Sequence, residues 1–241
     1  MISFIVPAYN EEQHLGPTLR AIQSATTGLT EPYEIIVADD ASTDGTAAEG
    51  AACGARVVSV NHRQIAATRN AGARATNGTL LIFVDADTLV TPEAVQAAVT
   101  AVRNGAVGGG CAFRFDGRVP LYARLLAGIA MPVYRWCGLA SGCFLFCTRA
   151  AFDAVGGFDE RLYAAEEAAM SQALRRQGRF VILRESVTTS ARKLRTHSMR
   201  EVLGTLLRIG LTGPRAVHTR EGLDIWYGER RSDVASTKDQ S

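Results

Sequence analysis

The sequence has no long uninterrupted apolar run, and its cysteines lack the spacing of a metal site. The most apolar stretch, residues 121–147, is broken by two arginines and a proline, so we expect no transmembrane helix there. Five cysteines are present, without a CxxC pair and without a histidine near the two that lie closest together. This pattern argues against zinc and favours reduced, mostly buried thiols, which are typical of a cytoplasmic protein.

Aromatic residues are also few, the net charge is small, and the N-terminus does not resemble a leader peptide. Aromatic residues make up 7% of the chain and are not interleaved with the basic ones, so we expect no nucleic-acid partner. The first residues lack a basic segment followed by a long apolar one, so we expect no secretory signal peptide. With 47% hydrophobic residues over 241 positions, the chain predicts one folded globular domain rather than a disordered or fibrous protein.

The charges that are present are unevenly distributed along the chain. Residues 1–100 hold 11 acidic and five basic residues, whereas residues 101–241 hold 13 acidic and 21 basic ones. Eight of those bases, with a single acid, fall between residues 173 and 200. The acid-rich half therefore suggests a metal or polar ligand, and the base-rich half suggests phosphate or a membrane surface.

Short apolar runs alternate with helical patterns in the first hundred residues. We predict strands over residues 2–6, 33–38, 56–60 and 80–84, and helices over 11–26, 64–76 and 91–104. Such alternation is typical of an α/β fold with a Rossmann-like, mostly parallel central sheet and helices on both faces.

The second half is less regular. We predict strands over 107–115, 142–147 and 180–183, and helices over 166–177, 198–211 and 215–221, with a partly helical segment over 120–139 that breaks at Pro132. The stretch after residue 230 is polar, and we predict a flexible tail over 231–241.

Polar side chains cluster where predicted strands end. Residues 7–12 follow the first strand, Asp39 and Asp40 end the second, and Asp85-Ala86-Asp87 follows the fourth. Since the carboxyl ends of parallel strands share one edge of a sheet, these groups should converge there. The Asp85-x-Asp87 pair offers hard oxygen ligands to Mg²⁺ or Mn²⁺. The alternative is that Asp87 only caps the following helix and Asp85 merely ends a strand.

The order of these motifs resembles the family 2 glycosyltransferases. The matching segments are VPAYNEE (6–12), IVADDASTDGT (36–46), ATRNAG (67–72), FVDAD (83–87), GGFDE (156–160), EE (166–167) and LRRQG (174–178). The resemblance covers roughly residues 2–190, and the TSARK segment at 189–193 is similar to a bacterial subgroup of small, stand-alone members. It implies a GT-A fold with a smaller acceptor-side region. A single domain over 1–230 would then bind the nucleotide sugar with residues 1–104 and the acceptor with residues 105–230.

The resemblance also implies roles for individual residues. It implies that Asp87 binds the metal and that Glu167 is the catalytic base, with Glu166 as the alternative. By likeness to some related enzymes, His197 would add a further metal ligand, and the alternative is an ordinary surface or core histidine. The remaining residues that the resemblance places around the nucleotide are Pro7, Ala8, Tyr9, Glu11, Asp39, Arg69, Asp85 and Ala86.

The chain departs from the family pattern at the base. The family's Glu-Asp pair is replaced by Glu166-Glu167, and glutamate is one methylene longer than aspartate. Glutamate is a competent general base, but geometry decides which of the two acids reaches the acceptor. The plainer interpretation is that both acids only favour the start of a helix.

The resemblance implies transfer of a sugar, with inversion, from a UDP- or GDP-sugar to an acceptor hydroxyl, using Mn²⁺ or Mg²⁺ and a DXD motif. One alternative is a polyprenyl-phosphate glycosyltransferase that contacts the inner face of the membrane through residues 121–139. Another is a nucleotide-sugar-binding module with little catalysis. One or two arginines between 175 and 195 are candidates to clamp the diphosphate, whereas Trp136 and Trp226 either stack on an acceptor or anchor the core. A homodimer remains open.

Overall fold

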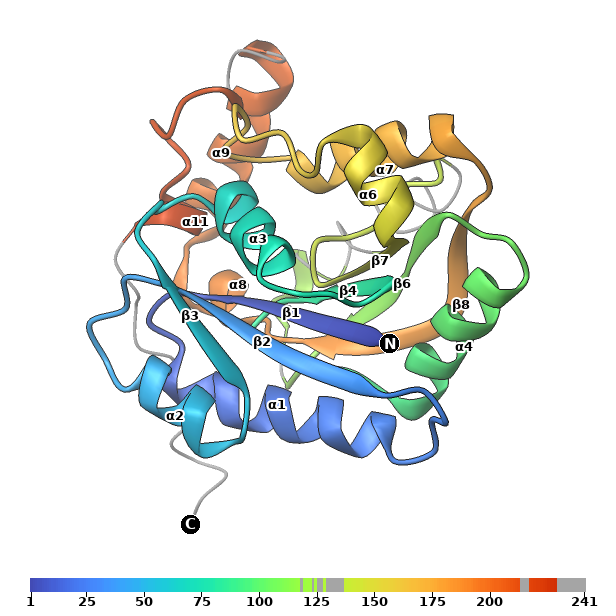
Figure 1. Ribbon diagram of the computed structural model, residues 1–241. Coiled ribbons are helices and arrows are strands. Elements are labelled where there is room, and N and C mark those ends of the chain that lie inside the picture. Colours follow the sequence, from blue (N-terminus) through green and yellow to red (C-terminus); the bar gives the residue numbers. More distant parts are fainter. Residues whose placement is uncertain (118, 123, 125–127, 129–136, 213–216, 229–241) are drawn as a thin grey trace.

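Eight strands form one curled sheet in the computed structural model (Figure 1), which describes residues 1–117, 119–122, 124, 128, 137–212 and 217–228. The strand order is β3-β2-β1-β4-β7-β6-β8-β5. The strands are β1 (Ile2–Ala8), β2 (Tyr33–Asp40), β3 (Arg56–Val60), β4 (Leu80–Val84), β5 (Thr88–Leu89), β6 (Gly108–Phe115), β7 (Phe144–Thr148) and β8 (Phe180–Thr189).

The first four strands form a parallel unit. β1 pairs in parallel with β2 and β4, and β2 pairs in parallel with β3. Helices α1 (Glu12–Thr26), α2 (Thr46–Ala52) and α3 (Ile65–Arg74) make the connections. The predicted strands are present, although β1 continues through Pro7. The helix α2 was not predicted, because its TAAEGAA sequence has no apolar periodicity and no side chain caps its start.

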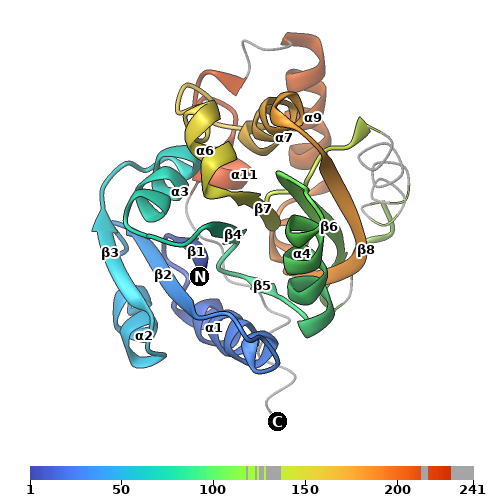
Figure 2. The ribbon, with the colours of Figure 1, turned by 45° about the vertical axis from the view of Figure 1, so that its right-hand side comes forward.

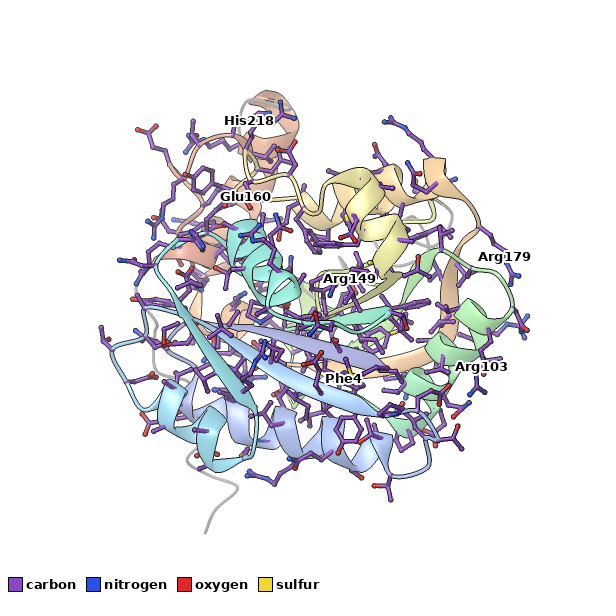
Figure 3. All side chains as sticks on the ribbon, viewed as in Figure 1. Phe4, Arg103, Arg149, Glu160, Arg179 and His218 are labelled. Atoms are coloured by element: carbon purple, nitrogen blue, oxygen red, sulfur yellow. The ribbon has the colours of Figure 1, made fainter. Side chains whose placement is uncertain are left out.

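Helices cover both faces of this sheet and bury a separate core on each (Figures 1 and 3). On one face, Leu15 and Leu19 of α1 and the buried side of α4 (Pro92–Arg103) form a cluster with Phe4 of β1. On the other, α3, α6 (Arg149–Val155) and α7 (Glu166–Gln177) pack against a second cluster around Phe83. The predicted α/β architecture with two covered faces is therefore confirmed.

The second half extends the same sheet with mixed pairing (Figure 2). β7 is antiparallel to both β4 and β6, so β4 and β6 run in the same direction, and β6 is parallel to β8. The carboxyl ends of β1, β2, β4, β6 and β8 consequently lie along one edge. β8 runs six residues beyond its predicted end at Leu183, past a register shift opposite Cys111 and Ala112.

The last described elements are α8 (Arg192–Thr196), α9 (Met199–Thr212) and α11 (Asp224–Tyr227). Helix α9 begins with a capping box, because Ser198 and Glu201 exchange hydrogen bonds between side chain and backbone N–H. The predicted helix over 215–221 is wrong at 218–221, where the chain bends and turns. Most of the segment predicted as partly helical, the tail and Trp136 lie outside the described residues. In the part of the chain that the structure describes, no helix is long and apolar enough to cross a membrane.

Candidate active site

A cavity of about 510 Å³ opens at the edge where the parallel strands end. Its walls come from both halves of the chain, including the segment after β1, the start of α3, the loop after β4, the start of α7 and helices α8, α9 and α11. The predicted site residues that line it are Pro7, Ala8, Tyr9, Glu11, Arg69, Asp85, Ala86, Asp87, Glu166 and Glu167. Asp39 and His197 are not among its lining residues.

The two aspartates that end β2 have different surroundings. Asp39 accepts one hydrogen bond, from the Ser42 backbone N–H at 3.3 Å. Asp40 accepts backbone N–H bonds from residues 62, 63 and 64 at 2.7, 2.8 and 3.1 Å, and a hydroxyl bond from Thr68 at 2.8 Å. Asp40 therefore fixes the loop that begins α3, a role that sequence reasoning missed. The assignment of Asp39 to the nucleoside stays a prediction.

Arg69 lies at the centre of the charged end of the cavity and is almost fully buried. Its Nη1 donates to Oε1 of Glu166 at 2.7 Å, and its Nη2 donates to Oδ1 of Asp85 at 2.8 Å and to the Gly142 carbonyl at 3.2 Å. Burial alone would lower the pKa of this guanidinium, but the charges of Asp85 and Glu166 outweigh burial and raise it. Arg69 therefore stays charged and joins α3, β4 and α7.

Glu166 and Glu167 begin α7 and point in different directions. Glu166 is buried against Arg69, whereas Glu167 is half-buried and lies beside Gly142. Burial and the charge of Glu166 raise the pKa of Glu167 to about 8, against the opposing effect of Arg69. A carboxyl group with a pKa near neutrality can take up a proton, which is the property that a general base needs.

Asp85 and Asp87 present carboxylate oxygens to the cavity. Their side chains are 34% and 14% exposed, and Asp85 forms an ion pair with Arg69 at 2.8 Å. Hard oxygen donors suit Mg²⁺ or Mn²⁺, so these residues fit the predicted cation. Among the described residues, no three His, Cys, Asp or Glu side chains are grouped to hold a metal ion. A cation here would therefore need further ligands from a bound diphosphate and water.

A second ion pair, between Glu11 and Arg192, lies beside Asp87. Both oxygens of Glu11 accept from Nη2 of Arg192, at 2.7 and 2.9 Å, and the same nitrogen is 3.9 Å from Oδ2 of Asp87. Arg192 belongs to the basic run that the sequence had suggested as a phosphate clamp, but its primary partner is the buried Glu11. Only the tertiary fold brings these two residues together, 181 positions apart in the chain.

Aromatic and aliphatic side chains also line the cavity. Phe113 and Phe115 end β6, and Trp226 and Tyr227 come from α11. The rings of Tyr227 and Tyr163 meet edge to face with centroids 5.7 Å apart. Trp226 was predicted either to stack on an acceptor or to anchor the core. Trp226 packs against the hydrophobic cluster that includes Leu162 and Leu223, as the second interpretation expects, and it also lines the cavity. Its stacking on an acceptor stays a prediction.

His197 follows α8, and its Nδ1 lies 3.0 Å from the Lys193 carbonyl oxygen and 3.2 Å from the Thr196 hydroxyl. Both contacts are local to α8. Its assignment as a metal ligand stays a prediction.

Comparison with known proteins gives a consistent picture. The family model described as "Glycosyl transferase family 2" matches residues 3–152. The chain is 33% identical over 129 residues to validoxylamine A glucosyltransferase of Streptomyces hygroscopicus, which covers 50% of this chain and 30% of the relative. It is 34% identical over 113 residues to undecaprenyl-phosphate 4-deoxy-4-formamido-L-arabinose transferase of Aeromonas hydrophila, which covers 44% of this chain and 34% of the relative. The chain thus matches about a third of the length of these curated relatives.

Among solved structures, a mannosyltransferase of Pyrobaculum calidifontis in complex with GDP-Man and Mn²⁺ aligns with a TM-score of 0.69 at 18% identity. The alignment covers 96% of this chain and 65% of that one. A likeness at this level concerns the fold, and it confirms the predicted GT-A fold.

Proposed function

Because the chain belongs to glycosyl transferase family 2, we propose that it transfers a sugar from a nucleoside-diphosphate sugar to a hydroxyl group of an acceptor. The observation that carries the proposal is the joint placement of Asp85, Asp87 and Glu167 in one cavity, with Arg69 between their elements. The named relatives, a glucosyltransferase and an arabinose transferase, support sugar transfer as the reaction class.

The charged end of the cavity would hold the donor. Asp87 and Asp85 would hold a divalent cation, which supplies positive charge against the diphosphate as it leaves. Arg69 is the cation that keeps Asp85 in place, and its buried pairs fix that position before the donor binds.

Glu167 would act as the general base. Its carboxylate takes the proton from the acceptor hydroxyl while the hydroxyl oxygen forms the new bond to the anomeric carbon. The bond from that carbon to the diphosphate oxygen breaks, and the nucleoside diphosphate leaves with the bonding electrons. Attack from the side opposite the leaving group inverts the configuration. Glu166 is less suited to this role, because Arg69 holds its carboxylate at 2.7 Å.

A panel of UDP- and GDP-sugars, tested with Mn²⁺ for hydrolysis and for transfer to candidate acceptors, checks the proposal. We expect turnover with one donor and a product whose anomeric configuration, read by NMR, is opposite to that of the donor. Retained configuration would contradict the single displacement. Tight binding of a donor without hydrolysis or transfer to any acceptor would favour the alternative of a binding module.

A lipid-linked phosphate acceptor is the second candidate, and helix α9 favours it. Met199, Leu203 and Leu207, spaced four residues apart, are 48%, 40% and 62% exposed. Val202 and Thr205 of the same helix line the cavity. A helix that exposes large apolar side chains beside the cavity suits an enzyme that works at a bilayer surface. A relative named for undecaprenyl phosphate is compatible with this candidate.

Flotation with vesicles of anionic lipid tests the second candidate. We expect the protein to float with the vesicles and the Leu203→Ser, Leu207→Ser double variant to stay behind. Leu89→Ser, which changes a similarly exposed leucine on β5, is the matched control. Two results would count against a membrane-bound acceptor. One is that the Leu203→Ser, Leu207→Ser variant floats as well as the Leu89→Ser control, and the other is that the unmodified protein does not float.

A further inference from the structure

We infer that Ser171 is a positioning residue, which from helix α7 fixes the segment 137–142 and with it the wall of the cavity beside Glu167. The inference rests on the proposed function, because it concerns the surroundings of the proposed base. Ser171 is fully buried and is not among the residues that line the cavity. Any effect that it has on the reaction must therefore pass through the groups that it holds.

The hydroxyl of Ser171 joins two backbone groups. Its Oγ accepts the Ala140 N–H at 3.0 Å and donates to the Glu167 carbonyl oxygen at 2.8 Å. A hydroxyl has one proton to donate and lone pairs with which to accept, so both bonds form at once. The segment 137–142 is thus linked through a single side chain to the backbone of the proposed base.

The same face of α7 meets this segment at more than one place. Glu167, Ser171 and Arg175 are spaced four residues apart, so they lie on one face of the helix. Ser171 binds Ala140, and Arg175 donates to the carbonyl oxygen of Cys137, three residues earlier in the chain. The exposed Arg175 therefore holds the outer end of the segment, and the buried Ser171 holds the part nearer to the cavity.

Ala140 is enclosed on its other side by the sheet. It is 1% exposed, and a Cβ placed on Gly110 of β6 would lie 2.5 Å from the Cβ of Ala140. This close contact leaves Ala140 no room to move toward β6. A buried N–H without a partner is costly, so loss of the Ser171 hydroxyl should let the segment shift away from α7 until water reaches that N–H.

The end of the segment forms the wall beside the base. Residues 141–143 line the cavity together with Glu167. A Cβ placed on Gly142 would lie 3.8 Å from the carboxyl carbon of Glu167 and 3.0 Å from Nη2 of Arg69. The Gly142 carbonyl oxygen accepts from the same Nη2 at 3.2 Å. A shift at Ala140, two residues away, would therefore change the space in which an acceptor hydroxyl meets Glu167.

Release of UDP or GDP from the panel of UDP- and GDP-sugars, with Mn²⁺, tests the inference. Misplacement of a reacting group by about 1 Å costs up to about 10²-fold in rate, so we expect Ser171→Ala to lower kcat by about tenfold. The donor Kd, measured by titration calorimetry, should change less than about twofold, because Ser171 does not contact the aspartates proposed to hold the diphosphate. Ser171→Thr keeps the hydroxyl and should retain kcat within about threefold.

Ser3→Ala is the matched control for loss of a buried hydroxyl. Ser3 is also fully buried, and its Oγ accepts the Gly78 N–H at 3.0 Å and donates to Oε1 of Glu34 at 2.7 Å. It lies at the start of β1, at the end of the strand away from the cavity. Both alanine variants should lower the melting temperature by a few degrees, and only Ser171→Ala should lower kcat.

The outer contact gives a second, milder test. Arg175→Gln removes the bond to Cys137 and should lower kcat less than Ser171→Ala does, because it frees only the exposed end of the segment. Arg176→Gln, at the next exposed position of α7, is its control and should leave kcat unchanged. If Ser171→Ala does not fold, this pair decides. A lower kcat in Arg175→Gln alone supports the inference, and equal values in the two variants overturn it.

Three results with the serine variants would overturn the inference: unchanged kcat in Ser171→Ala, an equal loss of kcat in Ser3→Ala, or a loss in Ser171→Thr as large as in Ser171→Ala. The first two would make Ser171 a purely structural residue, and the third would show that its hydroxyl is not what matters. If the unmodified protein releases no UDP or GDP from any donor, the proposed function itself fails. That outcome is distinct from an active protein whose Ser171 variants turn over normally.

Discussion

At the scale of single residues, the site depends on two adjacent glutamates that meet different neighbours. Consecutive positions of a helix point about 100° apart, so only one of the pair can face Arg69. Glu166 does so, and it is buried with its charge compensated. Among the described residues, no cation forms an ion pair with Glu167, whose pKa is raised. The order of the two acids in the sequence could not decide between them, because the answer depends on how α7 is rotated against α3.

The raised pKa of Glu167 predicts an alkaline pH profile. A carboxyl group acts as a base only when it is deprotonated, so kcat/KM should rise with pH, with its midpoint near pH 8, and level off above it. Glu167→Gln should lower turnover by about 10²–10⁴-fold and change the donor Kd only a few-fold. In Glu166→Gln the repulsive neighbour is lost, so the midpoint of the profile should move to lower pH. Steady-state rates of the three proteins across pH 5–10 check this. A profile that is flat above about pH 6 in the unmodified protein, as a carboxyl with the ordinary pKa of about 4.3 would give, would contradict it.

At the scale of elements, the periodic segments were predictable and the short ones were not. Strands β1 to β4 and helices α1, α3, α4 and α7 follow from apolar runs, caps and Gly178. The two-residue strand β5 has no pattern of its own and exists because it pairs with the end of β8. The extension of β8 to Thr189 likewise depends on pairing with β6 across a register shift. Long-range pairing of this kind leaves no trace in local sequence.

At the end of β2, we expect substitution of Asp40 to lower stability and substitution of Asp39 to weaken ligand binding. Asp40→Asn should lower the free energy of unfolding by about 2 kcal/mol, because an amide group replaces one of the oxygens that accept from the start of α3. Asp39→Asn should cost less than about 1 kcal/mol, because Asp39 accepts a single long bond. In titrations, Asp39→Asn should nevertheless weaken binding of the free nucleoside, since only an acceptor suits an N–H of the base. Urea unfolding separates the two stability effects. Equal losses of stability would contradict the distinction between the two residues.

At the scale of the whole molecule, the acid-rich first half and the base-rich second half meet at the cavity. Glu11 of the first half pairs with Arg192 of the second, and Arg69 of the first pairs with Glu166 of the second. The sequence had suggested separate partners for the two charged halves. The Glu11–Arg192 pair shows that an acid of the acid-rich half and a base of the base-rich half neutralise each other, which no local pattern could indicate. The carboxylate that the sequence selected as the metal ligand, Asp87, lies 3.9 Å from Arg192.

Because Asp87 lies beside the Glu11–Arg192 pair, the dependence of nucleotide binding on Mn²⁺ tests how these three charged side chains act together. Asp87→Ala should abolish the Mn²⁺-dependent part of the affinity for a nucleoside diphosphate and leave the melting temperature nearly unchanged, because the side chain lies at the cavity wall. Arg192→Gln should instead strengthen Mn²⁺ binding, because it removes a positive charge that lies beside both Asp87 and Glu11. Asp153→Ala, an exposed change on α6, is the control for loss of a carboxylate. Titration calorimetry with and without Mn²⁺ measures all three variants. If Asp87→Ala retains the metal dependence, the cation is held elsewhere. If Arg192→Gln weakens Mn²⁺ binding, the main effect of the Glu11–Arg192 pair is to hold the backbone around the metal site in place. The electrostatic repulsion between Arg192 and the cation is then the smaller effect.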